Sequence, residues 1–202
     1  MTQSHTPVLE AIVLAAGRGV RFGGDKLLAA LNGAPLVTGA LAAALAAPVR
    51  RVLVAVGDDP RLVDAVQAFA TPDRADRLVL VPVPQAAEGM GASLRTAASA
   101  VSAAAEGVFV FLGDMPTIAP DTPVRLAAAL DAPDRIVAPV HAGRRGHPVL
   151  FGRAWLPALK TLKGDEGARA LIAAAGSSLR LVEVDDRGVL LDIDRPEDLA
   201  RF

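Results

Sequence analysis

Cysteine and tyrosine are absent from this chain of 202 residues, which contains one tryptophan and three histidines. The absence of cysteine excludes disulfides, thiolate metal sites, iron–sulfur ligation and a cysteine nucleophile. The three histidines also lack the spacing of zinc ligands. The sequence is therefore compatible with a reducing compartment, and we expect a cytoplasmic protein.

An excess of charge of one sign is absent as well, because 21 basic and 22 acidic residues give a net charge of -1. Aromatic residues make up 3% of the chain. Proteins that bind nucleic acids use a basic surface that follows the phosphates, or aromatic side chains that stack on the bases. The composition therefore disfavours nucleic acid as a partner.

No apolar segment has the character of a membrane span. Residues 27–49 carry no charge, but polar and helix-breaking residues interrupt the run, and its apolar residues are mostly alanine. Residues 1–5 are polar and lack the basic region and apolar core of a signal peptide. We expect no contact with a membrane.

Apolar strand-like runs alternate with helical patterns along the chain. Strands are expected at residues 8–15, 51–56, 78–83, 108–112, 135–140, 147–151, 179–184 and 189–193. Helices are expected at residues 36–46, 60–69, 91–104, 120–130, 155–161, 166–175 and 196–201. This order predicts a single α/β domain over residues 1–202 with a doubly wound, Rossmann-like, mostly parallel sheet. Short connections between the later strands predict an antiparallel element.

A glycine-rich loop with three cations follows the first expected strand, in the segment from Val13 to Lys26. Glycines let the backbone approach phosphates closely, and Arg18, Arg21 and Lys26 supply positive charge. A tight turn between a strand and a helix would explain the glycines but would not require the cations. The segment favours a polyphosphate ligand and hence a nucleotide.

The spacing within this loop excludes two common nucleotide-binding motifs. The Walker motif requires Ser or Thr after its lysine, whereas Leu27 follows Lys26. The dinucleotide fingerprint G-x-G-x-x-G begins at Gly17 and Gly19 but has Phe22 in place of its third glycine. Neither a P-loop NTPase nor a Rossmann dehydrogenase is indicated.

Aspartates follow two of the later expected strands. Asp114 comes directly after the run at 108–112, which in doubly wound sheets usually neighbours the first strand at the ligand site. Asp114 is therefore placed to hold Mg²⁺, although a turn-forming aspartate before Pro116 is the alternative. Asp192 and Asp194 lie two residues apart in this segment, and we expect one of them to face the site. Asp194 is favoured because it lies closer to the strand's end.

Two further loops have the character of binding loops. Gly89, Gly91 and Ser93 introduce an alanine-rich helix, where free N–H groups could receive a ligand. The arginines at 144–145 and His147 could bind an anionic acceptor. Solvated arginines in an ordinary hairpin loop are the alternative for this second loop.

Six segments, in this order, resemble the nucleotidyltransferases related to molybdopterin guanylyltransferase: LAAGRGVRFGGDK, EGMGASL, FLGDMP, GHPVLF, GDEGAR and DIDRPEDL. The resemblance covers residues 14–199 and is greatest to the molybdenum cofactor cytidylyltransferase branch. Guanylyltransferases typically read L-A-G-G, whereas Ala16 follows Ala15 here. They also place five residues between the loop arginine and lysine, and four separate Arg21 from Lys26 here.

The resemblance implies a nucleotidyltransferase-type sheet and a Mg²⁺-dependent reaction. A cytidylyl group would pass from CTP to the phosphate of molybdopterin or the molybdenum cofactor, with release of pyrophosphate. The acceptor phosphate is itself the nucleophile and is ionised at neutral pH, so no Ser-His-Asp triad is required. Related alternatives are a transferase using GTP or another acceptor, such as a sugar phosphate, a non-catalytic delivery protein, and an oxidoreductase on the same fold.

The resemblance also implies partners and a set of site residues. The partners are CTP, a molybdopterin-type acceptor and a molybdenum hydroxylase that receives the product. Arg195 departs from the threonine that is usual beside the second metal ligand. The implied residues are Arg18, Arg21, Lys26 and Asp114 for catalysis; Leu14, Ala15, Ala16, Gly17, Arg18, Gly19, Lys26, Gly89, Gly91, Ser93 and Asp114 for the nucleotide; Met115, Gly146, His147, Pro148 and Asp165 for the acceptor; and Asp114 and Asp194 for Mg²⁺.

Overall fold

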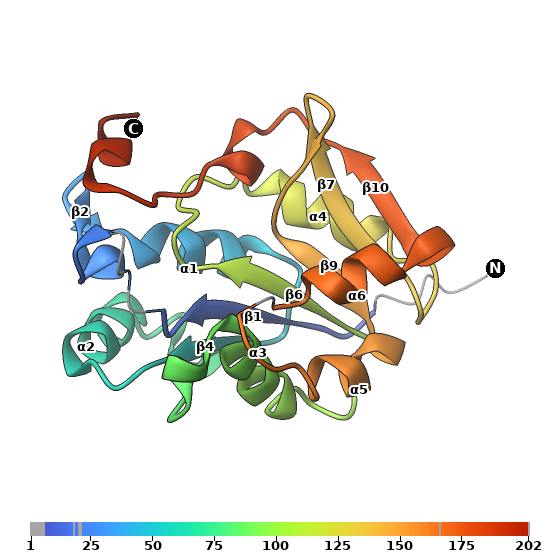
Figure 1. The fold of residues 1–202 in the computed structure, drawn as a ribbon, viewed down its shortest axis with the longest axis horizontal. Coiled ribbons are helices and arrows are strands. Elements are labelled where there is room, and N and C mark those ends of the chain that lie inside the picture. Colours follow the sequence, from blue (N-terminus) through green and yellow to red (C-terminus); the bar gives the residue numbers. More distant parts are fainter. Residues whose placement is uncertain (1–6, 18, 20–21, 166, 202) are drawn as a thin grey trace.

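The computed structural model describes residues 7–17, 19, 22–165 and 167–201. Its main sheet is covered by helices on both faces, as Figure 1 shows. The strands follow the order β10 (Leu179–Glu183), β7 (Ile136–His141), β9 (Val149–Gly152), β6 (Gly107–Leu112), β1 (Leu9–Ala15), β4 (Val52–Val56) and β5 (Leu78–Pro82). The helices are α1 (Val37–Ala46), α2 (Pro60–Phe69), α3 (Met90–Ser99), α4 (Asp121–Ala128), α5 (Leu156–Leu159) and α6 (Arg169–Ala174).

Parallel pairing dominates this sheet. Strands β5, β4, β1 and β6 are parallel to one another, and so are β7 and β10, whereas β9 runs antiparallel to both β6 and β7. A short strand, β8 (Arg144–Arg145), pairs antiparallel with β7, and β2 (Ala30–Leu31) forms a separate hairpin with β3 (Ala34–Pro35). The expected single-domain α/β fold with an antiparallel element is confirmed.

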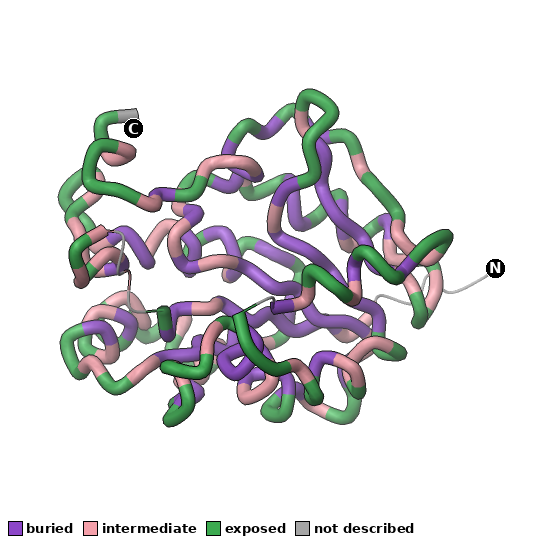
Figure 2. The backbone as a smooth tube through the Cα atoms, in the orientation of Figure 1, coloured by how far each residue is buried: buried purple, intermediate pink, exposed green. Residues whose placement is uncertain are grey.

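Two hydrophobic cores lie on the two faces of the sheet. Successive side chains of a strand point to opposite faces, so Val13 of β1 lies in one core and Ile12 in the other. Helices α1, α2 and α4 contribute to the first core, and α3, α5 and α6 contribute to the second. Figure 2 shows the central strands buried between these layers. Coverage of both faces explains why β1 is apolar along most of its length rather than alternating.

Three expected elements near the end of the chain and in its middle are different in the structure. The expected strand at 189–193 is wrong, because Arg187–Leu190 forms a 3₁₀ helix that begins at a capping interaction between the Asp186 carboxylate and the Gly188 N–H. The expected α-helix at 196–201 is a 3₁₀ helix, Pro196–Arg201. Helix α3 ends at Ser99, before the expected boundary at 104.

The charge-free run at 27–49 is divided among several elements. It contains most of the 3₁₀ helix Lys26–Leu28, then the β2–β3 hairpin and α1. Within the described part of the chain, no helix has both the length and the apolar character needed to cross a membrane.

A close contact between α1 and the loop after β6 connects the fold to the functional site. Gly39 of α1 lies against Pro116, and a Cβ atom at residue 39 would stand 2.6 Å from the Pro116 Cβ and closer still to its carbonyl oxygen. A side chain at this position would therefore displace the loop that carries Asp114. Glycine is required here for packing rather than for backbone conformation.

We predict that Gly39→Ala lowers the free energy of unfolding by about 1–2 kcal/mol, because overpacking outweighs the better helix propensity of alanine. Denaturant unfolding would measure this change. Gly57→Ala is the matched control, since a Cβ there would make only an ordinary contact at 3.5 Å to Ala16. An equal effect of the two substitutions would contradict the packing explanation.

Candidate functional site

The glycine-rich loop after β1 folds back on itself and directs Lys26 into the site. Phe22 and Gly24 both donate backbone hydrogen bonds to the Gly19 carbonyl, at 2.9 and 3.2 Å. Gly19 has a φ of 57°, and a Cβ atom there would lie 2.7 Å from the Lys26 Cβ. A glycine at 19 is therefore needed for both the turn and the approach of the lysine. Arg18 and Arg21, which were expected to bind phosphates, lie outside the described residues.

Asp114 reaches this loop because β6 pairs in parallel with β1. Leu112 lies opposite Leu14, and the Gly113 N–H continues the pairing with a 3.0 Å hydrogen bond to the Leu14 carbonyl. A Cβ atom at Gly113 would stand 2.8 Å from the same carbonyl oxygen, so the two chains meet at a glycine. The proximity of Asp114 to the glycine-rich loop that the sequence predicted is present in the structure.

The segment that carries Asp194 is bound to the loop after β6. The Ile193 N–H donates to the Asp114 carbonyl at 3.1 Å. The Asp198 carboxylate accepts hydrogen bonds from the backbone N–H groups of Asp194 and Arg195, at 3.0 and 2.9 Å. Asp198 therefore orients the backbone of Asp194. Asp192 is exposed and does not line the cavity described below.

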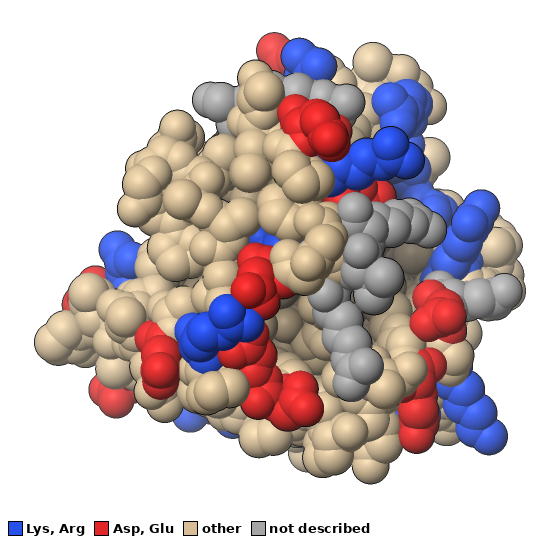
Figure 3. Space-filling model, turned by 60° about the vertical axis from the view of Figure 1, so that its left-hand side comes forward, with Lys and Arg blue, Asp and Glu red and all other residues tan. Residues whose placement is uncertain are grey.

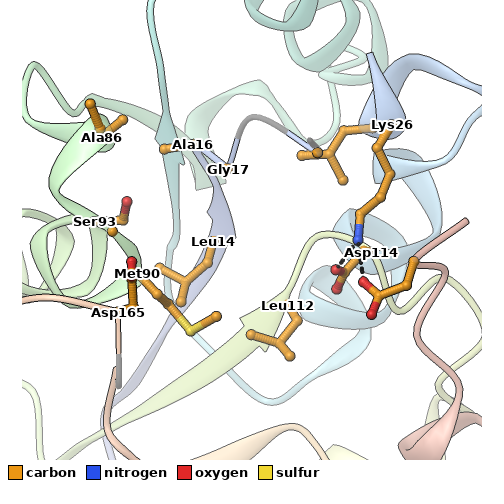
Figure 4. Close-up of a pocket in the computed structure, with 15 residues that line it drawn as sticks. Leu14, Ala16, Gly17, Lys26, Ala86, Met90, Ser93, Leu112, Asp114 and Asp165 are labelled. Carbon is orange, nitrogen blue, oxygen red and sulfur yellow. Dashed lines mark hydrogen bonds and ion pairs between the residues drawn. The ribbon is translucent and has the colours of Figure 1, made fainter. Parts of the chain in front are cut away.

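Lys26 lies between the two carboxylates. Its Nζ atom is 2.7 Å from Asp114 Oδ2 and 3.1 Å from Asp194 Oδ1. Figure 4 shows the Lys26 side chain pointing toward Asp114. The lysine side chain is only 11% exposed. Burial disfavours the charged ammonium, but the two carboxylates outweigh this effect and raise the pKa of Lys26 above its ordinary value. Lys26 is therefore a cation at neutral pH.

The carboxylates also have capacity for a divalent cation. Asp114 Oδ1 is buried and has no hydrogen-bond partner among the described residues. No cluster of three or more His, Cys, Asp or Glu side chains with metal-site geometry occurs in the described ranges. Mg²⁺ commonly binds through one or two carboxylates, keeps several waters and takes substrate phosphates as further ligands. Asp114 and Asp194 thus fit a magnesium site of this sparse kind.

A cavity of about 550 Å³ extends from Lys26 across the ends of β1 and β6. This volume lies within the usual range of small-molecule sites, about 300–1,000 Å³. The lining residues, several of which Figure 4 labels, are Leu14, Ala16, Gly17, Gly19, Lys26, Leu27, Ala86, Ala87, Gly89, Met90, Ser93, Leu112, Asp114, Asp165 and Asp194. We call this space the main cavity. Its charged end contains Lys26, and the end near Met90 is mostly apolar.

The segment 163–165 packs against the beginning of α3. The Gly91 N–H donates to the Gly164 carbonyl at 2.8 Å, and the Gly89 N–H donates to Ala86 at 3.2 Å. The expectation that these N–H groups are free for a ligand is therefore wrong. A Cβ atom at either glycine would overlap the 163–165 segment, being 2.8 Å from the Gly164 carbonyl at residue 89 and 2.7 Å at residue 91. The glycines permit a chain-to-chain contact.

The residues predicted to bind the acceptor are separated in the structure. Asp165 lines the main cavity, whereas Met115, Gly146 and Pro148 are buried and do not line it. The loop 146–148 is held by a 2.9 Å hydrogen bond from the His147 N–H to the Val189 carbonyl. The structure therefore brings Asp165 to the nucleotide-loop side and leaves the 146–148 loop outside the cavity lining.

Some residues around the site were not anticipated from the sequence. Ala86, Ala87 and Met90 line the apolar end of the main cavity, yet they resemble ordinary helix residues in the sequence. Arg61 of α2 binds the Asp25 carboxylate through two nitrogens, at 2.9 and 2.5 Å, and also binds Asp59. Arg61 thereby connects α2 to the residue that precedes Lys26. The only sequence signal for this connection was the acidic residue Asp25 directly before Lys26 at the end of the loop.

Acidic and basic side chains are interspersed on the face that Figure 3 shows, and the coloured residues there form no continuous basic stripe.

The MobA-like NTP transferase domain model matches residues 11–182. The chain belongs to this family. Nucleotide-dependent group transfer is the activity that this family membership supports.

Proteins that are similar to this chain in sequence have names that describe different functions. The chain is 32% identical to the purine catabolism protein PucB of Bacillus subtilis, over 96% of this chain and 95% of that protein. It is 29% identical to nicotine blue oxidoreductase of Paenarthrobacter nicotinovorans over the full length of both. It is 30% identical to molybdenum cofactor cytidylyltransferase of Escherichia coli over 60% of each chain.

A solved structure with the same fold is Rv0371c of Mycobacterium tuberculosis H37Rv. It superposes with a TM-score of 0.79 at 30% identity, covering 98% of this chain and 97% of that one. A second structure of Rv0371c, in complex with manganese, gives a TM-score of 0.73 at 27% identity over 96% of this chain and 97% of that one. The family fold is thus compatible with a divalent cation.

We predict that acidification below about pH 6.5 destabilises the protein through His147. Burial lowers the pKa of His147 most, and nearby Arg145 lowers it further, while a hydrogen bond with the Val110 backbone and the charge of Asp114 partly oppose this shift. In the window between this lowered pKa and the ordinary value of about 6.5, the unfolded chain binds a proton that the folded protein does not. The free energy of unfolding should fall as the pH decreases through that window.

Denaturant unfolding at pH 7.5 and at several values down to pH 5.5 would test this prediction for the wild type and His147→Gln. The variant should lose less stability than the wild type on acidification. Identical losses in the two proteins would exclude His147 as the responsible group.

Proposed function

We propose that this protein transfers a cytidylyl group from CTP to the terminal phosphate of a molybdopterin-type acceptor and releases pyrophosphate. The observation that carries the proposal is the position of Lys26, at the end of the glycine-rich loop, between Asp114 and Asp194. A cation for phosphates and two carboxylates for a divalent metal are what nucleotidyl transfer requires. The Ala15-Ala16 pair and the identity to the Escherichia coli cytidylyltransferase favour cytosine as the base.

In this proposal the chain positions two phosphates for an in-line displacement. Arg18, Arg21, Lys26 and the loop amides bind the triphosphate. An oxygen of the acceptor phosphate attacks the α-phosphorus, the bond to the β-phosphate oxygen breaks, and pyrophosphate leaves with that electron pair. The attacking oxygen is already ionised, so the residues need to orient it and exclude water rather than remove a proton.

Asp114 and Asp194 would hold Mg²⁺ in the same proposal. When bound, the ion would neutralise phosphate charge and increase the electrophilicity of the α-phosphorus. The manganese complex of Rv0371c supports a divalent cation in this fold. Asp198 and the Gly113–Leu14 contact would keep the two carboxylates in register.

Asp114→Asn should reduce Mg²⁺-dependent pyrophosphate release by about a hundredfold or more, because it removes a negative ligand without changing the side-chain shape. Asp192→Asn is the control, since Asp192 is exposed and outside the cavity lining. The circular dichroism spectrum of both variants should match the wild type. Unchanged turnover of Asp114→Asn would remove Asp114 from the metal role.

Lys26→Met should have opposite effects on two ligands. Nucleotide affinity should fall by about tenfold, because one charge-assisted contact to phosphate is lost. Affinity for Mn²⁺ without nucleotide should rise, because the ammonium that lies between the carboxylates is gone. Calorimetry and the electron paramagnetic resonance of free Mn²⁺ would measure both constants.

The control for this experiment is Lys26→Arg, which keeps the positive charge and should leave the affinity for Mn²⁺ alone close to that of the wild type. If Lys26→Met weakened Mn²⁺ binding, the lysine would be supporting the metal site rather than competing with it. Equal losses of nucleotide and acceptor affinity would contradict the assignment of Lys26 to the triphosphate.

A second candidate function is suggested by the full-length similarity to nicotine blue oxidoreductase. The experiment that separates the candidates supplies molybdopterin, Mg²⁺ and each nucleoside triphosphate in turn and measures pyrophosphate. CTP should give pyrophosphate. Release with GTP alone would indicate guanylyl transfer, and no release with any triphosphate would reject the transferase. A redox function would instead require a bound cofactor with its own absorbance.

A further inference from the structure

The main cavity has two chemically different ends. Lys26, Asp114 and Asp194 occupy one end. Figure 4 shows Asp165, Ser93 and Met90 together at the other end, with Leu14 and Leu112 between the two ends. The phosphates of a nucleotide are drawn to the cationic glycine-rich loop. The uncharged part of the same molecule then extends toward the apolar end. Under the proposed function, the base therefore lies beside Ser93 and Asp165.

The two polar groups at this end are open for a ligand. Neither the Asp165 carboxylate nor the Ser93 hydroxyl has a hydrogen-bond partner within the described ranges. Ser93 is only 6% exposed, so its hydroxyl faces the cavity rather than bulk solvent. Asp165 is exposed and lines the cavity, so its carboxylate is accessible to a ligand that binds there.

The position of Asp165 is fixed by the helix that also carries Ser93. The Gly91 N–H binds the Gly164 carbonyl at 2.8 Å, and the Arg95 guanidinium of α3 binds the Leu162 carbonyl at 2.9 Å. A Cβ atom at Gly89 would stand 2.9 Å from Asp165 Cγ, so the carboxylate lies directly over this glycine. Two backbone contacts on either side of residue 163 thus hold the carboxylate in the cavity wall.

We propose that Asp165 determines base specificity by accepting a hydrogen bond from an exocyclic amino group of the nucleobase, with Ser93 binding a neighbouring ring atom. A carboxylate offers only acceptors, so it pairs with the 4-amino group of cytosine and repels the 4-oxo group of uracil. Leu14, Met90 and Leu112 supply apolar surface for the ring. This inference rests on the proposed function and reassigns Asp165 from the acceptor to the nucleotide.

The test compares three ligands on the intact protein: CTP, UTP and the CTP analogue whose base is pyrimidin-2-one and lacks the 4-amino group. Calorimetry gives each dissociation constant in the presence of Mg²⁺. The wild type should bind CTP about tenfold or more tighter than either of the other two, as expected for one hydrogen bond to a charged group. Asp165→Asn should bring the three constants to within about threefold of one another, because its amide can donate to uracil as well.

Glu88→Gln is the matched control. It changes a carboxylate of the same region that pairs with Arg95 and lies outside the cavity lining, so the ratio of CTP to UTP affinity should stay as in the wild type. An Asp165→Asn protein with the wild-type ratio would overturn the inference, and so would a wild type that binds CTP and the analogue equally. A raised KM for the acceptor with an unchanged nucleotide ratio would return Asp165 to the acceptor.

The two proposals fail separately. If the wild type binds nucleotides through Lys26 but its base preference ignores Asp165, only the specificity role is lost. If it binds no nucleoside triphosphate, the proposed function falls and this inference falls with it.

Discussion

Parallel pairing of β1 with β6 is the constraint on which the site depends. Strands that run in the same direction end at the same edge of the sheet, so the loop after β1 and the loop after β6 must meet there. The hydrogen bond between Gly113 and Leu14 extends the pairing one step beyond the strands. The glycine-rich loop and Asp114 are consequently held together by backbone contacts, which require glycine at position 113.

Charge then brings a third segment to this edge. Asp194 lies near the end of the chain, and it meets Lys26 and Asp114 in a cluster with two negative charges and one positive charge. Lys26 is largely buried, so the attraction is screened less by solvent than in an exposed pair. One uncompensated negative charge remains, and a divalent cation and phosphates together complement this arrangement. The same cluster can therefore stabilise the ligand-free fold and prepare it for an anionic substrate with its metal.

The sequence was sufficient for features that depend on local pattern and strand order. Apolar runs on both faces of the sheet identified β1, β4, β5 and β6, and the position of Asp114 after a buried strand placed it beside the glycine-rich loop. The sequence did not indicate that Arg187–Leu190 is helical, because this depends on Asp186, a buried carboxylate that binds Gly188 and also Thr122 of α4.

Contacts between distant segments were also beyond the sequence pattern. Glycines before a helix have the same appearance whether they approach a ligand or another part of the chain, so the contact of Gly91 with Gly164 could not be anticipated. The alanines at 86–87 and Met90 became cavity residues only through the orientation of α3 and the turn before it. Arg18 and Arg21 lie outside the described residues and stay predictions.

The contact of residues 163–165 with α3 also has an evolutionary consequence. Backbone atoms and two glycines hold this segment, so the side chain of residue 165 can change while its place in the cavity wall is retained. Selectivity among substrates can therefore diverge by single substitutions. The fold and the charged end of the cavity are conserved in the process.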